Sequence, residues 1–216
     1  MEKKLKKIMK KMKRFKKICV ITTSRADYGQ LRNLTLLLKK EKTLKLQLIV
    51  AGSHFIKDKG YSVLEILKDK IPITYKIKIK TKNFQSKDVV DYTSENLKHF
   101  SNAFQRLKPD IIILLGDRYE TLAAATSALI FNIPIAHLHG GEITAGVIDE
   151  SLRHAITKMS DIHFTANSIF QNRVIRMGED KKNVYSVGAL TAENIKNLKM
   201  IKKDKIEKAF KFKFMK

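Results

Sequence analysis

The sequence predicts an α/β fold in which helices cover both faces of a doubly wound parallel sheet, a Rossmann-like architecture. Two observations indicate it. Short apolar runs alternate with amphipathic stretches along the chain, and the run Asp110–Gly116 (DIIILLG) is apolar almost throughout, as in a strand buried on both faces. Strands that alternate with helices imply right-handed βαβ crossovers and hence a parallel sheet. With 216 residues, 44% of them hydrophobic, the chain can bury the core of one such domain.

The predicted elements follow one another as strand and helix. The strands are the short apolar runs Lys17–Thr23, Leu44–Gly52, Ile73–Lys80, Asp110–Gly116, Ile133–His139, Asp161–Ala166 and Asn183–Gly188. The helices are the stretches between them, Tyr28–Lys40, Tyr61–Asp69, Val89–Leu107, Tyr119–Phe131, Asp149–Met159 and Ser168–Met177. Ile73–Lys80 alternates apolar and basic residues, which is typical of an edge strand.

The net charge of +23 is concentrated at the two ends of the chain. Residues 1–17 carry +9 and residues 196–216 carry +7. We therefore divide the chain into a basic extension (1–16), the Rossmann-like domain (17–197) and a basic tail (198–216). Apolar residues at helical spacing in 1–17 predict an amphipathic helix, and the alternation Phe210, Phe212, Phe214 predicts the start of a strand. Charge gathered at the ends favours solvated extensions over a nucleic-acid-binding module, which remains one alternative.

Several classes of protein are disfavoured by the composition. The lone Cys19 forms neither an intramolecular disulfide nor a cysteine-ligated zinc site. No apolar run approaches the roughly 20 residues that cross a bilayer, and the basic N-terminal stretch is not followed by the apolar segment of a secretory signal. We therefore expect a cytoplasmic protein without membrane contact.

Polar side chains gather after four of the predicted strands. They are Ser24 to Tyr28, Ser53 and His54, Gly116 to Arg118, and His137 to Glu142. Because ligands of an open parallel sheet bind beyond the carboxyl ends of its strands, we expect one crevice there. Each cluster also has a structural interpretation, in which Asp117 caps the next helix, or Arg153 and His154 pair with Asp149 and Glu150.

A metal site is the alternative reading of the same residues. The candidate ligands are His137, His139, Glu142, Asp149 and His154. His137 and His139 lie two apart on a strand and so project to the same face. The set lacks the defined spacing of a helical zinc motif, and we therefore favour a site without metal.

Five segments in order carry a resemblance to a known family. They are TTSRADYGQL (Thr22–Leu31), AGSHF (Ala51–Phe55), LLGDRYETLAAA (Leu114–Ala125), IPIAHLHGGE (Ile133–Glu142) and IDESLRHAITKMSDIHF (Ile148–Phe164). Together they resemble the hydrolysing UDP-N-acetylglucosamine 2-epimerases of sialic-acid biosynthesis, over about Lys16 to Asn197. Members of that family resemble type-B glycosyltransferases, with two Rossmann-like domains around a cleft, and the chain matches the N-terminal one.

The resemblance implies a reaction and its residues. UDP-GlcNAc loses UDP to give 2-acetamidoglucal, and water adds to give N-acetylmannosamine, without metal or nicotinamide. The catalytic positions implied are Asp117, Asp149, Glu150, Glu142 and His139, and the substrate-binding positions are Arg25, Asp27, Tyr28, His54, Arg118, Arg153 and His154. Arg25 matches the arginine that contacts the diphosphate, and the full-length enzyme is expected to be a homo-oligomer.

Two departures from the family leave alternatives open. The strand-end position that is often Glu is His139 here, so that either His139 or Glu142 serves as the acid or base. The second domain, which in the family supplies most uridine contacts and a catalytic histidine, is not matched, and we expect a truncated chain with little activity alone. A GDP-linked substrate of the legionaminic-acid type, or a non-catalytic remnant that binds a partner, are the remaining alternatives.

Overall fold

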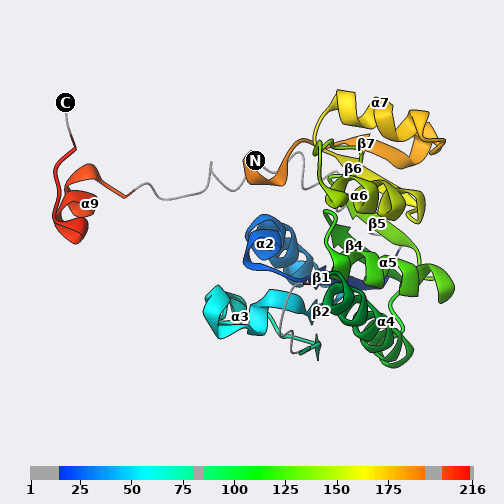
Figure 1. The fold of residues 1–216 in the computed structure, drawn as a ribbon, viewed down its shortest axis with the longest axis horizontal. Coiled ribbons are helices and arrows are strands. Elements are labelled where there is room, and N and C mark those ends of the chain that lie inside the picture. The colour runs from blue at the N-terminus through cyan, green and yellow to red at the C-terminus, as the bar shows by residue number, and fades with distance from the viewer. Residues whose placement is uncertain (1–14, 80–84, 193–200, 215–216) are drawn as a thin grey trace.

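A seven-stranded parallel sheet forms the centre of the domain (Figure 1). The computed structural model describes residues 15–79, 85–192 and 201–214. The strand order is β3-β2-β1-β4-β5-β6-β7, and every neighbouring pair is parallel. The strands are β1 (Lys17–Thr22), β2 (Lys45–Val50), β3 (Tyr75–Lys76), β4 (Ile111–Leu115), β5 (Ile135–Leu138), β6 (Ile162–Thr165) and β7 (Val184–Ser186). The predicted doubly wound parallel sheet is confirmed, and the order reverses between β1 and β4.

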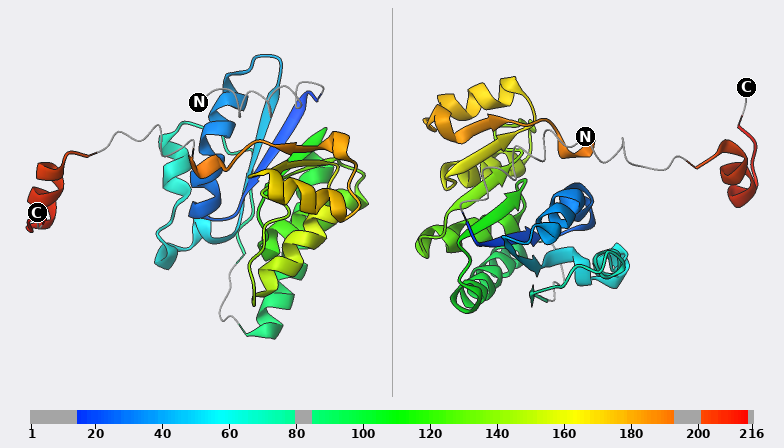
Figure 2. Two further views of the ribbon diagram at one scale, coloured as in Figure 1. Left: turned by 90° about the horizontal axis from the view of Figure 1, so that it is seen from above. Right: turned by 180° about the vertical axis from the view of Figure 1, so that it is seen from behind.

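Helices cover both faces of this sheet, as Figure 2 shows. They are α2 (Arg25–Lys40), α3 (Val63–Lys68), α4 (Ser86–Leu107), α5 (Tyr119–Ile130), α6 (Ile148–Lys158) and α7 (Ser168–Arg176). One apolar core lies between the sheet and α2 and α3, and includes Leu31 and Leu34. A second core lies on the opposite face against α4, α5 and α6, and includes Phe100 and Phe104. Alternate residues of β1 and β4 enter opposite cores, because successive side chains of a strand point to opposite faces.

The predicted edge strand is confirmed in its place but not in its length. β3 pairs with β2 only at Tyr75 and Lys76, although the apolar and basic alternation continues beyond them. β2 ends at Val50, and the chain then turns into a short 3-10 helix, η1 (Gly52–Phe55). Within the described residues, the last backbone hydrogen bond between this edge and β2 is donated by the N–H of Ile77 to the carbonyl oxygen of Val50, at 2.9 Å.

The strand predicted to begin at Phe210–Phe214 is wrong. Phe210 ends a helix, α9 (Lys203–Phe210), in which Lys203 and Glu207 form an ion pair one turn apart. Phe212 and Phe214 lie beyond the helix with their ring centroids 4.8 Å apart in an edge arrangement, so they face each other and do not alternate between the faces of a sheet.

Some predictions fall outside the described residues. They are the amphipathic helix of the N-terminal extension, in 1–14, and the boundary between domain and tail, in 193–200. In the part of the chain that the structure describes, no helix has both the length and the apolar character that a bilayer crossing requires.

Candidate functional site

The four polar clusters lie at one edge of the sheet. They follow β1, β2, β4 and β5, and these four strands are neighbours in the order β2-β1-β4-β5. Because all strands are parallel, their carboxyl ends share this edge. The prediction that four strand ends meet is confirmed at the level of the backbone. This edge includes the β1–β4 switch point, where an open parallel sheet binds its ligands, and we use the word crevice for the residues at these four strand ends.

Asp117 is held by an arginine of α6. Its carboxylate accepts a hydrogen bond from Nη2 of Arg153, and Nη1 of Arg153 donates to Oγ1 of Thr144 at 3.0 Å. The side chains of Asp117 and Arg153 are only 17% and 10% exposed. Arg118, not Asp117, occupies the N-cap position of α5, so the capping interpretation of Asp117 is wrong. The pair joins the end of β4 to α6.

The first turn of α6 brings two more carboxylates to the same edge. Asp149 lies four residues before Arg153 and therefore on the same face of the helix. Oε1 of Glu150 lies 3.8 Å from Nε2 of His154, so one of the predicted pairs of side chains within this helix is in contact. The other is wrong, because Arg153 turns to Asp117 and leaves Asp149 without that cation. Arg153 thus contacts Asp117, and Asp149 lies one turn before it in the same helix without contacting it.

His139 and Glu142 form a single hydrogen-bonded unit. Nδ1 of His139 lies 2.8 Å from Oε1 of Glu142, and the two side chains are 14% and 27% exposed. His139 follows the end of β5 with a φ of +65°, in the left-handed region, and this turn directs the ring back toward Glu142. Either group remains a candidate acid or base.

The loop that carries Glu142 is clamped by α7. A Cβ at Gly141 would lie 2.7 Å from the Phe170 carbonyl oxygen, and φ at Gly141 is +78°, so only glycine fits here. Nη1 of Arg173 donates to the carbonyl oxygen of Gly141. Sequence reasoning missed Arg173, because nothing in its helix distinguishes it from a surface arginine.

Two predicted site histidines are buried within the fold. His54 is fully buried, with Nε2 2.9 Å from Oγ1 of Thr22 and Nδ1 2.8 Å from Oγ of Ser62. His137 is also fully buried, 2.9 Å from the Gly116 carbonyl oxygen. These bonds of His54 tie the loop after β2 to the end of β1 and to Ser62, and its contact with substrate stays a prediction.

The metal alternative finds no support in the geometry. β5 ends at Leu138 and the chain turns at His139, so His137 and His139 do not share a strand face as expected. Among the described residues, no three His, Cys, Asp or Glu side chains are grouped closely enough to hold a metal ion.

Buried neutral histidines predict a loss of stability in mild acid. Burial lowers the pKa of His54 to about 4 and that of His137 to about 3, and also lowers the pKa of His163. The unfolded chain binds protons near pH 6.5, so the stabilisation is present above that pH and is lost as the pH falls toward the folded values. We expect the free energy of unfolding to drop by about 2 kcal/mol for His54 between pH 7 and pH 5.

Urea denaturation at pH 7, 6 and 5 measures this effect. His54→Asn should lower stability at pH 7 and flatten the decline between pH 6.5 and pH 5. An unchanged slope in that variant would show that the pKa of His54 is the same in the folded and the unfolded chain, and would contradict the expectation.

Three predicted binding residues surround the start of α2. Asp27 accepts from Oγ1 and N–H of Thr23, at 2.6 and 3.2 Å, and the buried Tyr28 donates its hydroxyl to Asp69 at 2.5 Å. Both side chains are thus committed to the fold, and the expectation that they contact substrate directly is not supported by these bonds. Arg25 is 75% exposed and pairs with Glu65 at 2.9 Å, which leaves it at the helix N-terminus where an anion can exchange with Glu65.

Arg118 has a buried partner that sequence reasoning missed. Its Nε donates to Oε2 of Glu120 at 3.3 Å, and the hydroxyl of Tyr92 donates to Oε1 at 2.7 Å. Glu120 is 2% exposed. A single acid in the otherwise apolar first turns of α5 was the available signal, whereas Tyr92, 28 residues earlier, could not be paired with it from spacing.

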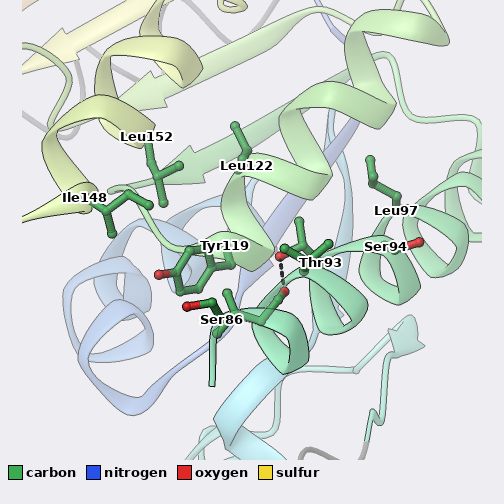
Figure 3. Close-up of a pocket in the computed structure, with 10 residues that line it drawn as sticks. Ser86, Thr93, Ser94, Leu97, Tyr119, Leu122, Ile148 and Leu152 are labelled. Atoms are coloured by element: carbon green, nitrogen blue, oxygen red, sulfur yellow. Dashed lines mark hydrogen bonds between the residues drawn. The ribbon is translucent and has the colours of Figure 1, made fainter. Parts of the chain in front are cut away.

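A separate apolar groove runs along the helices on one face of the sheet (Figure 3). It has a volume of about 580 Å³, and it is lined by residues of α4, α5 and α6, among them Val90, Leu122 and Leu152. Its lining contains hydroxyl groups but no charged side chain. The groove therefore lacks the cations and carboxylates of the crevice, which we take as the candidate site.

Comparison with known proteins decides the family. The sequence profile of the UDP-N-acetylglucosamine 2-epimerase family matches residues 37–215. The chain belongs to this family. The chain is 40% identical to the GDP/UDP-N,N'-diacetylbacillosamine 2-epimerase (hydrolyzing) of Campylobacter jejuni. This match covers 92% of the chain and 51% of that protein. It is 37% identical to the UDP-N,N'-diacetylbacillosamine 2-epimerase (hydrolyzing) of Legionella pneumophila, covering 91% and 52%.

Solved structures of 2-epimerases share the fold of this family member. The UDP-GlcNAc 2-epimerase of Neisseria meningitidis bound to UDP-GlcNAc superposes with a TM-score of 0.75 at 21% identity, over 90% of this chain and 53% of that one. The Methanocaldococcus jannaschii enzyme in complex with UDP-GlcNAc and UDP gives 0.77 at 22% identity, over 90% and 52%. The resemblance seen in the five motifs is confirmed for the family, and the chain spans about half the length of the relatives it matches.

Proposed function

We propose that the protein acts as a hydrolysing nucleotide-sugar 2-epimerase that converts UDP-GlcNAc and water to N-acetylmannosamine and UDP. Family membership supports this reaction class. The observation that carries it to particular residues is the Asp117–Arg153 pair, which fixes one carboxylate at the β1–β4 switch point beside the helix turn that bears Asp149. Two carboxylates near one arginine supply the acid and the base that the reaction needs.

The reaction has two steps with different demands. In the first, a base removes the proton from C2, the bond between C1 and the UDP oxygen breaks, and a C1–C2 double bond forms. In the second, the oxygen of water adds to C1 and a proton is delivered to C2 on the opposite face. We assign the proton transfers to Asp117, Asp149 and Glu150, together with His139 and Glu142, whose side chains lie within hydrogen-bond distance of each other.

The diphosphate and the sugar are assigned to the cations of the crevice. We propose that Arg25 at the start of α2 and Arg118 at the start of α5 contact the diphosphate, because helix N-termini and guanidinium groups both favour phosphate. Arg153 and His154 would line the sugar side, and Asp27, Tyr28 and His54 would act by positioning the loops around it.

The identity of the sugar nucleotide is the finer part of the proposal. Relatives at 40% and 37% identity are named as diacetylbacillosamine 2-epimerases, one of them for GDP-linked or UDP-linked forms. We therefore propose UDP-GlcNAc, for the synthesis of a sialic-acid-type sugar, with a UDP-linked or GDP-linked diacetylbacillosamine as the specific alternative. Release of the nucleotide diphosphate from each of the three substrates distinguishes them.

We further propose that turnover requires a second domain of the kind that completes the relatives. The polypeptide of 216 residues alone should therefore release little or no UDP. Fusion of residues 15–216 to the remaining half of the Campylobacter jejuni relative should restore turnover, measured as UDP release together with N-acetylmannosamine formation. Substantial turnover by the 216-residue chain would contradict the requirement.

The fusion also tests the catalytic assignment. Asp117→Asn should lower kcat by about 10² to 10⁴, the range expected on loss of a general acid or base. The matched control is Asp91→Asn in α4, because Asp91 is 63% exposed and pairs only with Lys87 of its own helix among the described contacts. If Asp117→Asn and Asp91→Asn give equal rates in a folded fusion, the role of Asp117 is wrong.

A further inference from the structure

Glu120 is a buried carboxylate at the edge of the crevice, and nothing in the proposed reaction uses it. It lies in the first turn of α5, and its side chain is 3% exposed. An ionised carboxylate that is removed from water is costly unless charged or polar partners replace its hydration. Its partners are the hydroxyl of Tyr92, at 2.7 Å from Oε1, and Nε of Arg118, at 3.3 Å from Oε2.

The surroundings of Glu120 come from three segments far apart in the sequence. Tyr92 belongs to α4, which packs against α5 (Figure 1). From the loop after β2, Gly52 approaches so closely that a Cβ there would lie 2.7 Å from Oε1 of Glu120. This contact covers one side of the carboxylate, and the Glu120 cluster (Tyr92, Glu120 and Arg118) therefore has a fixed geometry.

The guanidinium of Arg118 is held by only one of its three nitrogens. Nε is bonded to Glu120, whereas the two terminal nitrogens make no hydrogen bond within the part of the chain that the structure describes. The side chain is 42% exposed. Its neighbour Asp117 is bound to Arg153 from α6, so the two consecutive residues are fixed by partners from different elements at the end of β4.

An arginine with a bound Nε and two unengaged terminal nitrogens is prepared for an anion. The terminal N–H groups form a planar fork that matches two oxygens of a phosphate or carboxylate. Holding the guanidinium in place before the ligand arrives removes part of the ordering cost of binding. Glu120 supplies the counter-charge at Nε and so leaves the fork for the ligand.

We propose that Glu120 and Tyr92 are positioning residues, which orient the Arg118 guanidinium toward an anionic group of the substrate. The inference rests on the proposed function for the identity of that group, the diphosphate of a nucleotide sugar. The orientation of Arg118 itself is inferred from its contacts alone and is independent of the proposed function. The two can therefore fail separately.

The orientation is tested on the chain itself by NMR of the arginine Nε–H groups. The Arg118 signal is assigned by its loss in Arg118→Lys. We expect its exchange with water to be at least tenfold slower than that of Arg176, an exposed arginine in α7. Glu120→Gln should bring the two rates together, and Tyr92→Phe should have a smaller effect in the same direction. Glu95→Gln and Tyr119→Phe are the matched controls and should leave the rate unchanged, since Glu95 is an exposed residue of α4 and Tyr119 lines the apolar groove.

The link to the substrate is tested by a double-mutant cycle with UDP-GlcNAc, titrated by NMR into the 216-residue chain. Glu120→Gln should raise Kd about tenfold when Arg118 is present and less than twofold in an Arg118→Lys background, because its effect passes through Arg118. Equal losses in both backgrounds would show a merely structural role and overturn the inference.

Two further outcomes keep the conclusions apart. If the unaltered chain does not bind UDP-GlcNAc, the proposed substrate contact fails, while the exchange rate of Arg118 still decides the orientation. If Glu120→Gln does not fold, Tyr92→Phe replaces it in the cycle, since this variant removes a single hydroxyl. If Arg118 exchanges with water as fast as Arg176 in the unaltered chain, the inference is overturned.

Discussion

Arg153→Met is expected to destabilise the domain by about 3 kcal/mol and to abolish binding of the sugar nucleotide. The variant removes the only cation that contacts Asp117 among the described residues and leaves a carboxylate that is 17% exposed. Breaking a buried ion pair by removing one partner commonly costs about 3–5 kcal/mol, and the residual exposure of Asp117 places the expectation at the lower end. Urea denaturation at pH 7 measures the loss.

Addition of Asp117→Asn to Arg153→Met should recover much of this stability, since the uncompensated charge is then gone. Recovery of stability without recovery of binding is the expected signature of a pair that serves the site. The control is Arg176→Met, which removes an exposed arginine of α7 and should change stability by less than about 0.5 kcal/mol. Purely additive losses in the double variant would contradict the assignment of Arg153 to Asp117.

Gly52→Ala is expected to cost about 3 kcal/mol or more, for two reasons that add. The backbone has a φ of +61°, which strains any residue with a Cβ. The added Cβ would also lie 2.4 Å from the Thr23 carbonyl oxygen, a backbone atom that cannot move aside as a flexible side chain does. Because that oxygen accepts hydrogen bonds from Ser53, the loops after β1 and β2 must separate to admit the methyl group.

Gly60→Ala separates the two causes. Its φ is +86°, so it carries the backbone strain, but no described atom lies within 4 Å of the added Cβ. We expect a loss of about 1 kcal/mol from strain alone. Thermal unfolding of both variants measures the difference, and equal losses would mean that the contact of Gly52 with Thr23 and Glu120 relaxes without cost.

The backbone architecture was predictable because each strand is an apolar run bounded by polar residues. In the part of the domain that the structure describes, the seven strands and the helices α2 to α7 occur where periodicity places them, within a few residues. Parallel pairing followed from the helix between each pair of strands. β3 is shorter than the alternating sequence pattern predicts, because its partner β2 ends at Val50. The sequence of an edge strand does not show how long its partner strand is.

The position of the site was predictable and its contacts were not. The rule for open parallel sheets placed the polar clusters at one edge, and this required only the order of elements. The partner of Asp117 lies 36 residues away, and the partner of Glu120 lies 28 residues away in the other direction. Helical spacing predicted an ion pair between Arg153 and Asp149, but Arg153 instead forms a tertiary ion pair with Asp117.

Burial also separated residues that look alike in the sequence. Tyr28 and His54 stand in motifs that resemble a binding site, yet both side chains are buried and bonded within the fold. A sequence motif can contain residues that bind a ligand and residues that stabilise the surrounding loops, and the sequence alone does not tell the two apart. The strand predicted in the tail was wrong for a different reason. Phe212 and Phe214 are two residues apart, as in a strand, but their rings pack on each other.

The start of β1 has a practical consequence for experiments on this chain. The carboxylate of Asp110 accepts the backbone N–H groups of Lys16 and Lys17, at 2.9 and 2.8 Å, and so fastens the beginning of β1 to the beginning of β4. This anchor lies at the amino ends of the strands, and the crevice lies at their carboxyl ends, about 20 Å away along six residues of β1. An affinity tag or fluorescent reporter that replaces residues 1–14 is therefore joined at the edge of the sheet opposite to the crevice, and immobilisation through it leaves the crevice facing the solution.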